Sequence, residues 1–466
     1  MAVSVKPAVN RGEIIKWAIS ILVPIIILLI PVNAVFTSQM RTFFAITVCG
    51  LFVIAFEFFD NIVPAIIMPA AWVFFGVTTI DKAFSGFMGT IAYMVLGAFL
   101  LATVLEEIGL LQRLAYWCLV KAGGNFMGLL LGLFLAGLLL TLVTFGNGYI
   151  IMAAISYGVC KAMKLQRGRT SAAVMMACIL GAVAARVYIY SPTTISVLVQ
   201  NARLVVPGFD INFYQASGHN WPLAVASLIC LFIVYKWYGP KEHDADSKAY
   251  FQNELTKMGP MTPAEKKALV VVAILLVYLL SVPLHGFATD WGFIFIPWLM
   301  FFPGFRVCKS PEVTIKNVNF SMLFFVVACM GIGTTASSLG LGNIIAEFCL
   351  PLFQGGNIFT QVSLVYAVCF VLNFLMTPLA IFSLITVPLC EIALMIGVDP
   401  RVFVYTILHA CEAIILPYEY VPYLIAYSFG MMTMVDFIKL NVMRTLIYFA
   451  GFLLLVVPYW MLLGII

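Results

Sequence analysis

The sequence predicts an all-α polytopic membrane protein with about eleven transmembrane helices and two re-entrant hairpins, arranged as two inverted repeats. Three observations predict this fold class: the composition, the positions of the basic residues, and an internal repeat. Of the 466 residues, 63% are hydrophobic and 10% are charged, against about 25% charged in an average soluble domain. With a mean hydropathy of +1.08, the chain carries more apolar surface than a water-facing shell could cover, which excludes a soluble globule.

Continuous apolar runs such as residues 129–142 indicate helices, because the strands of a transmembrane barrel alternate in hydrophobicity. The eleven cysteines stand singly, and we interpret them as small core residues. The first apolar stretch, residues 19–35, follows Lys6, Arg11 and Lys16 and is too long for the apolar region of a signal peptide. We therefore expect an uncleaved first span and a cytoplasmic N-terminus.

Apolar segments follow one another along the whole chain. They cover residues 14–35, 42–58, 62–78, 88–108, 127–142, 148–160, 170–200, 219–238, 267–284, 290–305, 319–338, 359–376, 380–397, 402–428 and 443–466. If every segment crossed the membrane, the basic loops 161–169 and 236–267 would lie on opposite sides, against the positive-inside rule. The conflict disappears if 127–160 and 359–397 are re-entrant hairpins, each entering and leaving on one face.

The basic residues then separate by side. Twenty of the 25, including Lys439 and Arg444, are expected in the cytoplasm, and Arg186 alone is expected within a span. Arg41, Lys82, Arg203 and Arg401 are expected outside. This distribution agrees with a multi-pass protein of the inner (plasma) membrane.

An internal repeat supports the topology. Gly123-Gly124-Asn125 recurs 232 positions later as Gly355-Gly356-Asn357, and each is followed by a hairpin and a span interrupted near a proline. Inverted repeats with broken helices are typical of secondary transporters. The predicted organisation is an N-terminal scaffold (1–87), a first repeat (88–205) with hairpin 127–160 and broken helix 170–200, linking spans (206–318) with a cytoplasmic loop (239–265), a second repeat (319–437) with hairpin 359–397 and broken helix 402–428, and a last span (438–466).

At four places we expect non-helical backbone inside the membrane. The polar groups of such backbone need partners in protein or water. The four places are the tips Gly146-Asn147-Gly148 and Pro378-Leu379-Ala380 and the breaks Ser191-Pro192-Thr193-Thr194 and Glu419-Tyr420-Val421-Pro422-Tyr423. Helix ends there direct free N–H groups at an anion and free carbonyls at a cation. The alternative interpretation is ordinary helical kinks.

Charged residues inside these spans are candidates for function. Arg186 suits a carboxylate or sulfonate ligand, and a structural pair with Glu412 or Glu419 is an equal alternative. His409, Glu412 and Glu419 fall on one face of an unbroken helix, where they could relay a proton or join the two halves by hydrogen bonds. Neither a catalytic motif nor a nucleotide-binding loop occurs, so we expect no enzyme and no cofactor, and any uphill transport must use an ion gradient.

The chain from about residue 64 to its end resembles the divalent anion/sodium symporter family, the dicarboxylate, citrate and sulfate carriers of the ion transporter superfamily. Residues 93–115 are similar to that family's fourth span and following surface helix. Leu416-Pro-Tyr-Glu-Tyr-Val-Pro-Tyr423, Gly430 and Asp436-Phe-Ile-Lys439 are similar to its Leu-Pro-x-x-Thr-Pro-Pro-Asn, Gly and Asp-x-x-Lys sequence. The resemblance implies a homodimer that carries a small organic anion by an elevator motion, with sodium as the coupling ion.

In that family, Ser-Asn-Thr at each hairpin tip binds substrate carboxylates and helps to form a sodium site. Here the first tip keeps only the asparagine and the second keeps none of the three, although backbone carbonyls could still hold sodium. The expected substrate ligands are Asn147, Gly148, Arg186, Thr193, Thr194, Thr377, Leu379 and Tyr423, and the expected ion ligands are Thr144, Gly146, Asn147, Ser191, Pro378, Ala380 and Val421.

The altered tips leave the substrate and the driving ion open. Together with Arg186, the residues Tyr188, Tyr190 and Tyr423 favour an aromatic or monoanionic compound over an ordinary dicarboxylate. Proton coupling and an uncoupled exchanger or channel are the alternatives to sodium symport.

Overall fold

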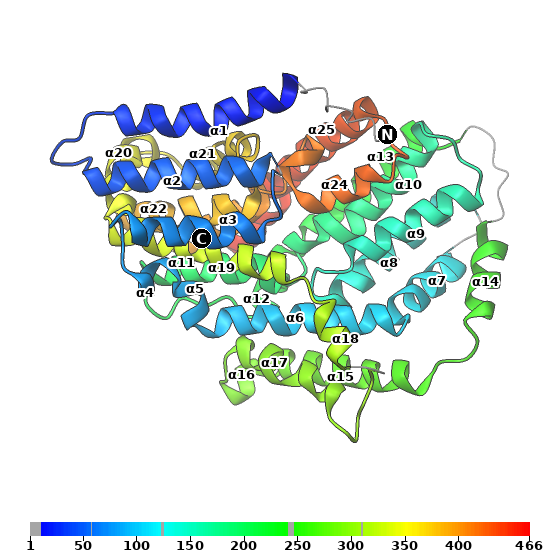
Figure 1. The fold of residues 1–466 in the computed structure, drawn as a ribbon. Coiled ribbons are helices and arrows are strands. Elements are labelled where there is room, and N and C mark those ends of the chain that lie inside the picture. Colours follow the sequence, from blue (N-terminus) through cyan, green and yellow to red (C-terminus); the bar gives the residue numbers. More distant parts are fainter. Residues whose placement is uncertain (1–10, 57, 123–124, 241–246, 309–310) are drawn as a thin grey trace, which may run out of the picture.

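The computed structural model describes residues 11–56, 58–122, 125–240, 247–308 and 311–466, and this part of the chain is helical without strands (Figure 1). Most helices run roughly parallel across the molecule, with α1 along one edge and α15 along the opposite edge (Figure 1). The expectations placed on Lys6, Gly123 and Gly124 lie outside the described residues.

The first two N-terminal helices lie along one edge, and the next three pass toward α6 (Figure 1). Phe43, Trp72 and Ala83 from these helices are packed against Ala328 and Ala380 from the second half in one apolar cluster. These five helices are α1 (Arg11–Leu29), α2 (Ser38–Ala55), α3 (Ile62–Phe74), α4 (Ile80–Ala83) and α5 (Ser85–Met88).

The predicted order of a span, a short helix, a hairpin and a broken helix is present twice. The first set is α6 (Thr90–Glu107), α7 (Leu110–Ala122), α8 (Phe126–Thr144), α9 (Tyr149–Ala162) and α10 (Arg169–Cys178), which continues through a π-helical turn (Ile179–Val183) and a 3-10 turn (Ala184–Val187) to α11 (Pro192–Arg203). The second set is α19 (Phe320–Ser338), α20 (Leu341–Phe353), α21 (Ile358–Asn373), α22 (Pro378–Met395), α23 (Pro400–Ala410), a 3-10 turn (Pro417–Glu419) and α24 (Val421–Ser428).

The segment between the two sets is less regular. The apolar residues 290–305 form a seven-residue helix and a 3-10 turn rather than one continuous helix. The loop predicted to be cytoplasmic (239–265) contains a helix, α14, whose buried Phe251 ring lies 6.0 Å from the Tyr116 ring of α7. The elements here are α12 (Phe213–Asn220), α13 (Leu223–Tyr238), α14 (Ser247–Lys257), α15 (Pro263–Leu280), α16 (Val282–His285), α17 (Thr289–Phe295), the 3-10 turn Ile296–Phe301 and α18 (Pro311–Lys316).

The chain ends with α25 (Met434–Gly451), a π-helical turn (Phe452–Val456) and α26 (Val457–Leu462). Thr433 caps α25 by accepting the Asp436 N–H, so this helix begins nine residues earlier than the apolar segment 443–466 suggested. As a consequence, Lys439 and Arg444, both expected in the cytoplasm, are residues of α25.

Within the described ranges, six segments are long and apolar enough to cross a membrane, or seven if α12 and α13, which meet at a bend of 53°, form one span. Several shorter apolar helices accompany them, including α1, α2, α3, α9 and α21. The fold class is therefore confirmed as an all-helical multi-pass membrane protein, and the number of eleven spans stays a prediction.

The first hairpin is packed tightly on the first broken helix. A Cβ atom on Gly137 of α8 would lie 2.7 Å from the carbonyl carbon of Gly181, and one on Gly181 would lie 2.4 Å from the Phe134 carbonyl oxygen. Backbones approach this closely only through small residues, as in other membrane helix pairs. The hairpin and the helix beside it therefore form one packed unit.

Candidate functional site

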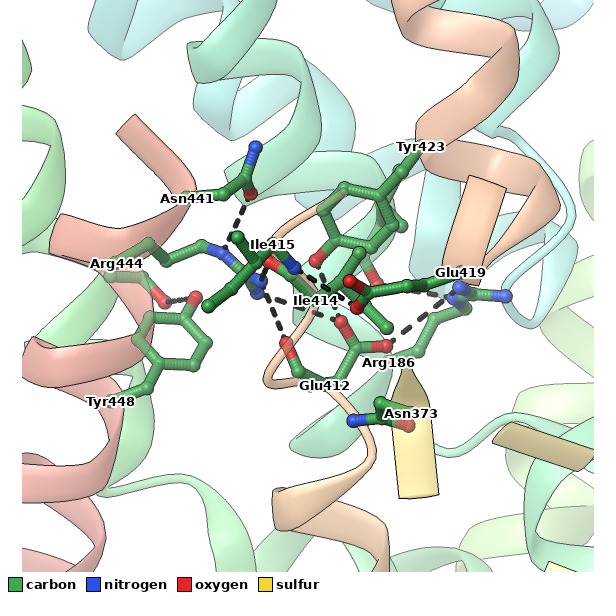
Figure 2. Close-up of polar contacts among 12 residues, drawn as sticks. Arg186, Asn373, Glu412, Ile414, Ile415, Glu419, Tyr423, Asn441, Arg444 and Tyr448 are labelled. Carbon is green, nitrogen blue, oxygen red and sulfur yellow. Dashed lines mark hydrogen bonds and ion pairs between the residues drawn. The ribbon is translucent and has the colours of Figure 1, made fainter. Parts of the chain in front are cut away.

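Two helices are interrupted in the interior of the protein, and their breaks face each other. In the first half, helical structure ends at Val187 and resumes at Pro192; in the second, it ends at Ala410 and resumes, after a 3-10 turn, at Val421. Pro192 and Pro422 stand in the first turn of the resumed helices, where a missing N–H costs no intrahelical bond. The side chains between the breaks form a charged cluster (Figure 2).

Glu412 lies at the centre of this cluster and faces two arginines (Figure 2). Its Oε1 is 3.8 Å from Nη2 of Arg186, and its Oε2 is 3.7 Å from Nη1 of Arg444. The hydroxyl of Tyr423 donates a hydrogen bond of 2.8 Å to the same Oε2. All four side chains are buried, so the acid supplies the counter-charge that buried guanidinium groups need.

Arg444 of α25 binds the backbone of the second break. Its Nη2 donates to the carbonyl oxygens of Glu412 at 2.7 Å and Ile414 at 3.1 Å, and its Nε donates to Asn441 at 3.2 Å. The prediction that Arg444 lies in the cytoplasm was wrong, and with it the prediction that Arg186 is the only basic residue within a span. The reason is the early start of α25, which places Arg444 well inside the helix with no exposed surface.

Arg186 has fewer partners than Arg444. Its Nε donates to the Val183 carbonyl at 3.1 Å, and the rings of Tyr420 and Tyr149 lie 4.8 and 5.7 Å from its guanidinium carbon. Among the described residues, its Nη2 has no hydrogen-bond partner, although Glu412 is near. Both interpretations of Arg186 therefore have support: it pairs with Glu412, and it retains an unused donor.

The first hairpin tip contacts this arginine. A Cβ atom on Gly146 would lie 2.8 Å from Oγ of Ser191 and 3.0 Å from Cδ of Arg186. Gly146 has φ +96°, and the buried Phe145 before it has φ +53°, a conformation that is strained for a side chain of this size. Backbone strain of this kind is concentrated at functional sites.

Polar side chains that the sequence singles out surround the first tip and the first break. Asn147 donates its N–H to Oγ1 of Thr144 at 3.1 Å, and Ser191 and Thr193 share a hydroxyl hydrogen bond of 3.0 Å. Thr194 donates to the Ser191 carbonyl at 3.1 Å. Gly148 ends the turn, where a Cβ atom would lie 2.9 Å from that of Leu140. The structure thus brings the expected residues of the first half together beside Arg186.

The second tip differs from its prediction. Pro378, Leu379 and Ala380 form the first turn of α22, because a proline with fixed φ starts a helix readily, and the turn itself covers residues 374–377. Leu379 and Ala380 are 1% exposed and pack in apolar clusters. Near the turn, Asn373 donates to the Ala410 carbonyl at 3.2 Å, and Oγ1 of Thr377 is buried without a hydrogen-bond partner among the described residues.

His409, Glu412 and Glu419 do not lie on one helical face, because α23 ends at Ala410. His409 shares a 2.8 Å hydrogen bond with Asn220, and Glu419 accepts the backbone N–H groups of Ile415 and Leu416. Val421 is the first residue of α24. Each of the three groups thus has its own partners, and they do not form a row.

The other two tyrosines at the first break, Tyr188 and Tyr190, contact side chains of the protein itself. Tyr188 shares a 3.1 Å hydrogen bond with Ser227, and Tyr190 contacts the sulfur of Met94. Across the described part of the chain, no three His, Cys, Asp or Glu side chains gather in a way that could hold a metal ion.

A model of a family described as citrate transporters matches residues 51–408. The chain belongs to the citrate transporter family. The match includes Arg186 and the first tip and ends before Glu412, Glu419 and Arg444. A comparison with proteins of curated function gave no match.

Two solved transporters share the fold with this member of the citrate transporter family. The YdaH transporter of Alcanivorax borkumensis is 16% identical, with a TM-score of 0.59 over 85% of this chain and 90% of that one. MtrF of Neisseria gonorrhoeae, presented as one of a class of antimetabolite efflux pumps, is 15% identical, with a TM-score of 0.55 over 86% of this chain and 94% of that one. The expectation of a multi-pass membrane transporter is confirmed.

Proposed function

We propose that this protein is a secondary active transporter that carries a small organic anion across the inner membrane and binds a substrate carboxylate at Arg186. One observation carries the proposal. Arg186 is the middle residue of a 35-residue apolar segment, is 5% exposed, and has an Nη2 without a hydrogen-bond partner among the described residues. Charge-assisted bonds from a buried guanidinium are about twice as strong as neutral ones, which makes such a group a good carboxylate ligand.

Glu412 supports the proposal because it can keep the site neutral when the substrate is absent. Its contact with Arg186 is long, at 3.8 Å, whereas Tyr423 donates to it at 2.8 Å. A substrate carboxylate could therefore replace Glu412 at Arg186 while the acid stays with Arg444 and Tyr423. The rings of Tyr420 and Tyr149 lie beside the guanidinium, and we propose that they provide apolar surface for an aromatic or monoanionic substrate.

The polar residues of the first half would complete the binding site. Asn147, Thr193 and Thr194 would contact the substrate, and the oxygens of Thr144 and Ser191 would hold the coupling ion. Hydroxyl and carbonyl oxygens are suitable ligands for a hard cation, so we propose sodium as that ion. The movement we propose is an elevator motion in a homodimer, supported by the resemblance to the symporter family and by the tight packing of α8 against Gly181.

The test begins with binding. Purified protein is heated with citrate, with benzoate as an aromatic monocarboxylate, and with related anions, and the melting temperature is recorded. We expect one anion class to raise it in the wild type and in Arg203→Ala, which removes an arginine paired with Asp210 at the end of the same segment. Arg186→Ala should abolish the rise; a rise that survives this change would contradict the proposed site.

The coupling ion is tested separately with the same compound. Uptake into proteoliposomes is measured under an imposed sodium gradient and under an imposed pH gradient. Uptake driven by sodium supports the proposal, and uptake driven only by the pH gradient contradicts it. Counterflow that needs neither gradient would instead identify an exchanger.

A further inference from the structure

A groove on the surface, whose lining includes none of the side chains of the charged cluster, runs between α13 and α25. It has a volume of about 800 Å³, and its walls are mainly apolar, with Ile233, Trp237, Met443 and Leu446 among the lining residues. Trp237 is 58% and Leu446 is 64% exposed. In a protein that lies in a membrane, such side chains face acyl chains rather than water.

One end of this groove is basic and aromatic. Arg169 and Lys439 are exposed lining residues at this end, and Tyr238 lies beside them. Arg169 donates through Nη2 to the Trp237 carbonyl at 2.7 Å and lies 5.1 Å from the centre of the Tyr238 ring. Tryptophan and tyrosine are enriched where a membrane meets water, which places this end at the level of the lipid head groups.

The charges around this end are unequal. Asp436 is the acidic residue of the lining, and its carboxylate already accepts the Thr433 hydroxyl at 2.6 Å in the cap of α25. Arg169 and Lys439 oppose it, and Lys236 lies next to Trp237 in the chain. Among the described residues, Lys439 makes no side-chain hydrogen bond or ion pair. The groove therefore combines an apolar slot with surplus positive charge at its head-group end.

We propose that this groove binds one anionic phospholipid, with the phosphate at Arg169 and Lys439 and an acyl chain along Ile233, Met443 and Leu446. Basic pockets between membrane helices suit anionic head groups. The lipid would join the start of α10, the end of α13 and α25. Since α10 leads into Arg186 and α25 carries Arg444, it would hold together the helices that carry the two buried arginines.

The test is native mass spectrometry of the full-length protein in neutral detergent. Phosphatidylglycerol and phosphatidylcholine with identical acyl chains are titrated in parallel, and the fraction of protein with one bound lipid is measured. We expect a one-to-one adduct at clearly lower concentrations of phosphatidylglycerol. Equal affinity for the two lipids would overturn the proposal.

Charge-removing variants locate the site. Lys439→Gln, which breaks no contact, should weaken phosphatidylglycerol binding about fivefold, as expected for one basic residue near an anionic surface, and Arg169→Gln with Lys439→Gln about thirtyfold. Lys82→Gln removes an exposed charge in α4 and should leave binding unchanged. Unchanged binding in both Lys439 variants would overturn the proposal. The proposal would also be overturned if the variants lost a protein dimer and kept the lipid adduct, because the groove would then bind a second copy of the chain.

Discussion

The two repeats have the same order of elements but carry opposite charges at their breaks. The first half supplies Arg186 and a polar tip that touches it through Gly146. The second half supplies Glu412 and an apolar helix start, in which Leu379 and Ala380 are buried in the core. A duplicated backbone thus places two similar half-sites face to face, and the side chains make one of them cationic and the other its counter-charge.

The largest effect should follow from removing that counter-charge. Glu412→Ala leaves Arg186 and Arg444 buried without an acid between them, and breaking a buried pair in this way costs about 3–5 kcal/mol. We expect a strongly lowered melting temperature and a low yield of folded protein in detergent.

A double variant separates charge from packing. In Arg186→Met with Glu412→Met, apolar side chains of similar size replace one buried pair, and one buried arginine, Arg444, is left without the acid instead of two. Its melting temperature should lie above that of Glu412→Ala. If Glu412→Ala melts at the wild-type temperature, the cluster does not hold the two breaks together.

The sequence predicts the elements better than it predicts the site. Long apolar runs and prolines are local signals, so both broken helices and the first tip lie where they are expected. Arg444 was misplaced because a charged residue near a predicted helix end looks like a flank, and only the Thr433 cap reveals the earlier start. The pairing of Arg186, Glu412 and Arg444 joins residues far apart in the chain, and no spacing rule encodes it.

The first tip should tolerate the addition of a methyl group less well than the second tolerates the removal of one. Gly146→Ala forces a side chain into φ +96° and against Ser191 and Arg186, which we expect to cost about 1–3 kcal/mol. Transport should fall more than stability, because the added methyl displaces Arg186.

Ala380→Gly is the matched change at the second half. It removes a buried methyl in the first turn of α22 and should cost about 1–2 kcal/mol, with transport retained. Uptake and melting temperature of both variants are compared. A Gly146→Ala protein that transports normally would show that the tip does not need its close approach to Arg186.

The smallest changes in stability should come from removing two threonine hydroxyls, one at each hairpin tip. Oγ1 of Thr144 donates to the Leu140 carbonyl at 2.7 Å and accepts the Asn147 N–H, so Thr144→Val should cost about 1 kcal/mol. Oγ1 of Thr377 is buried without a partner among the described residues, so Thr377→Val should leave the melting temperature unchanged.

If the Thr377 hydroxyl binds substrate, the KM for uptake rises about tenfold in Thr377→Val with no loss of stability, since one lost hydrogen bond of about 1.4 kcal/mol corresponds to that factor. An unchanged KM would assign substrate binding to the first half alone and make the asymmetry between the repeats functional as well as structural.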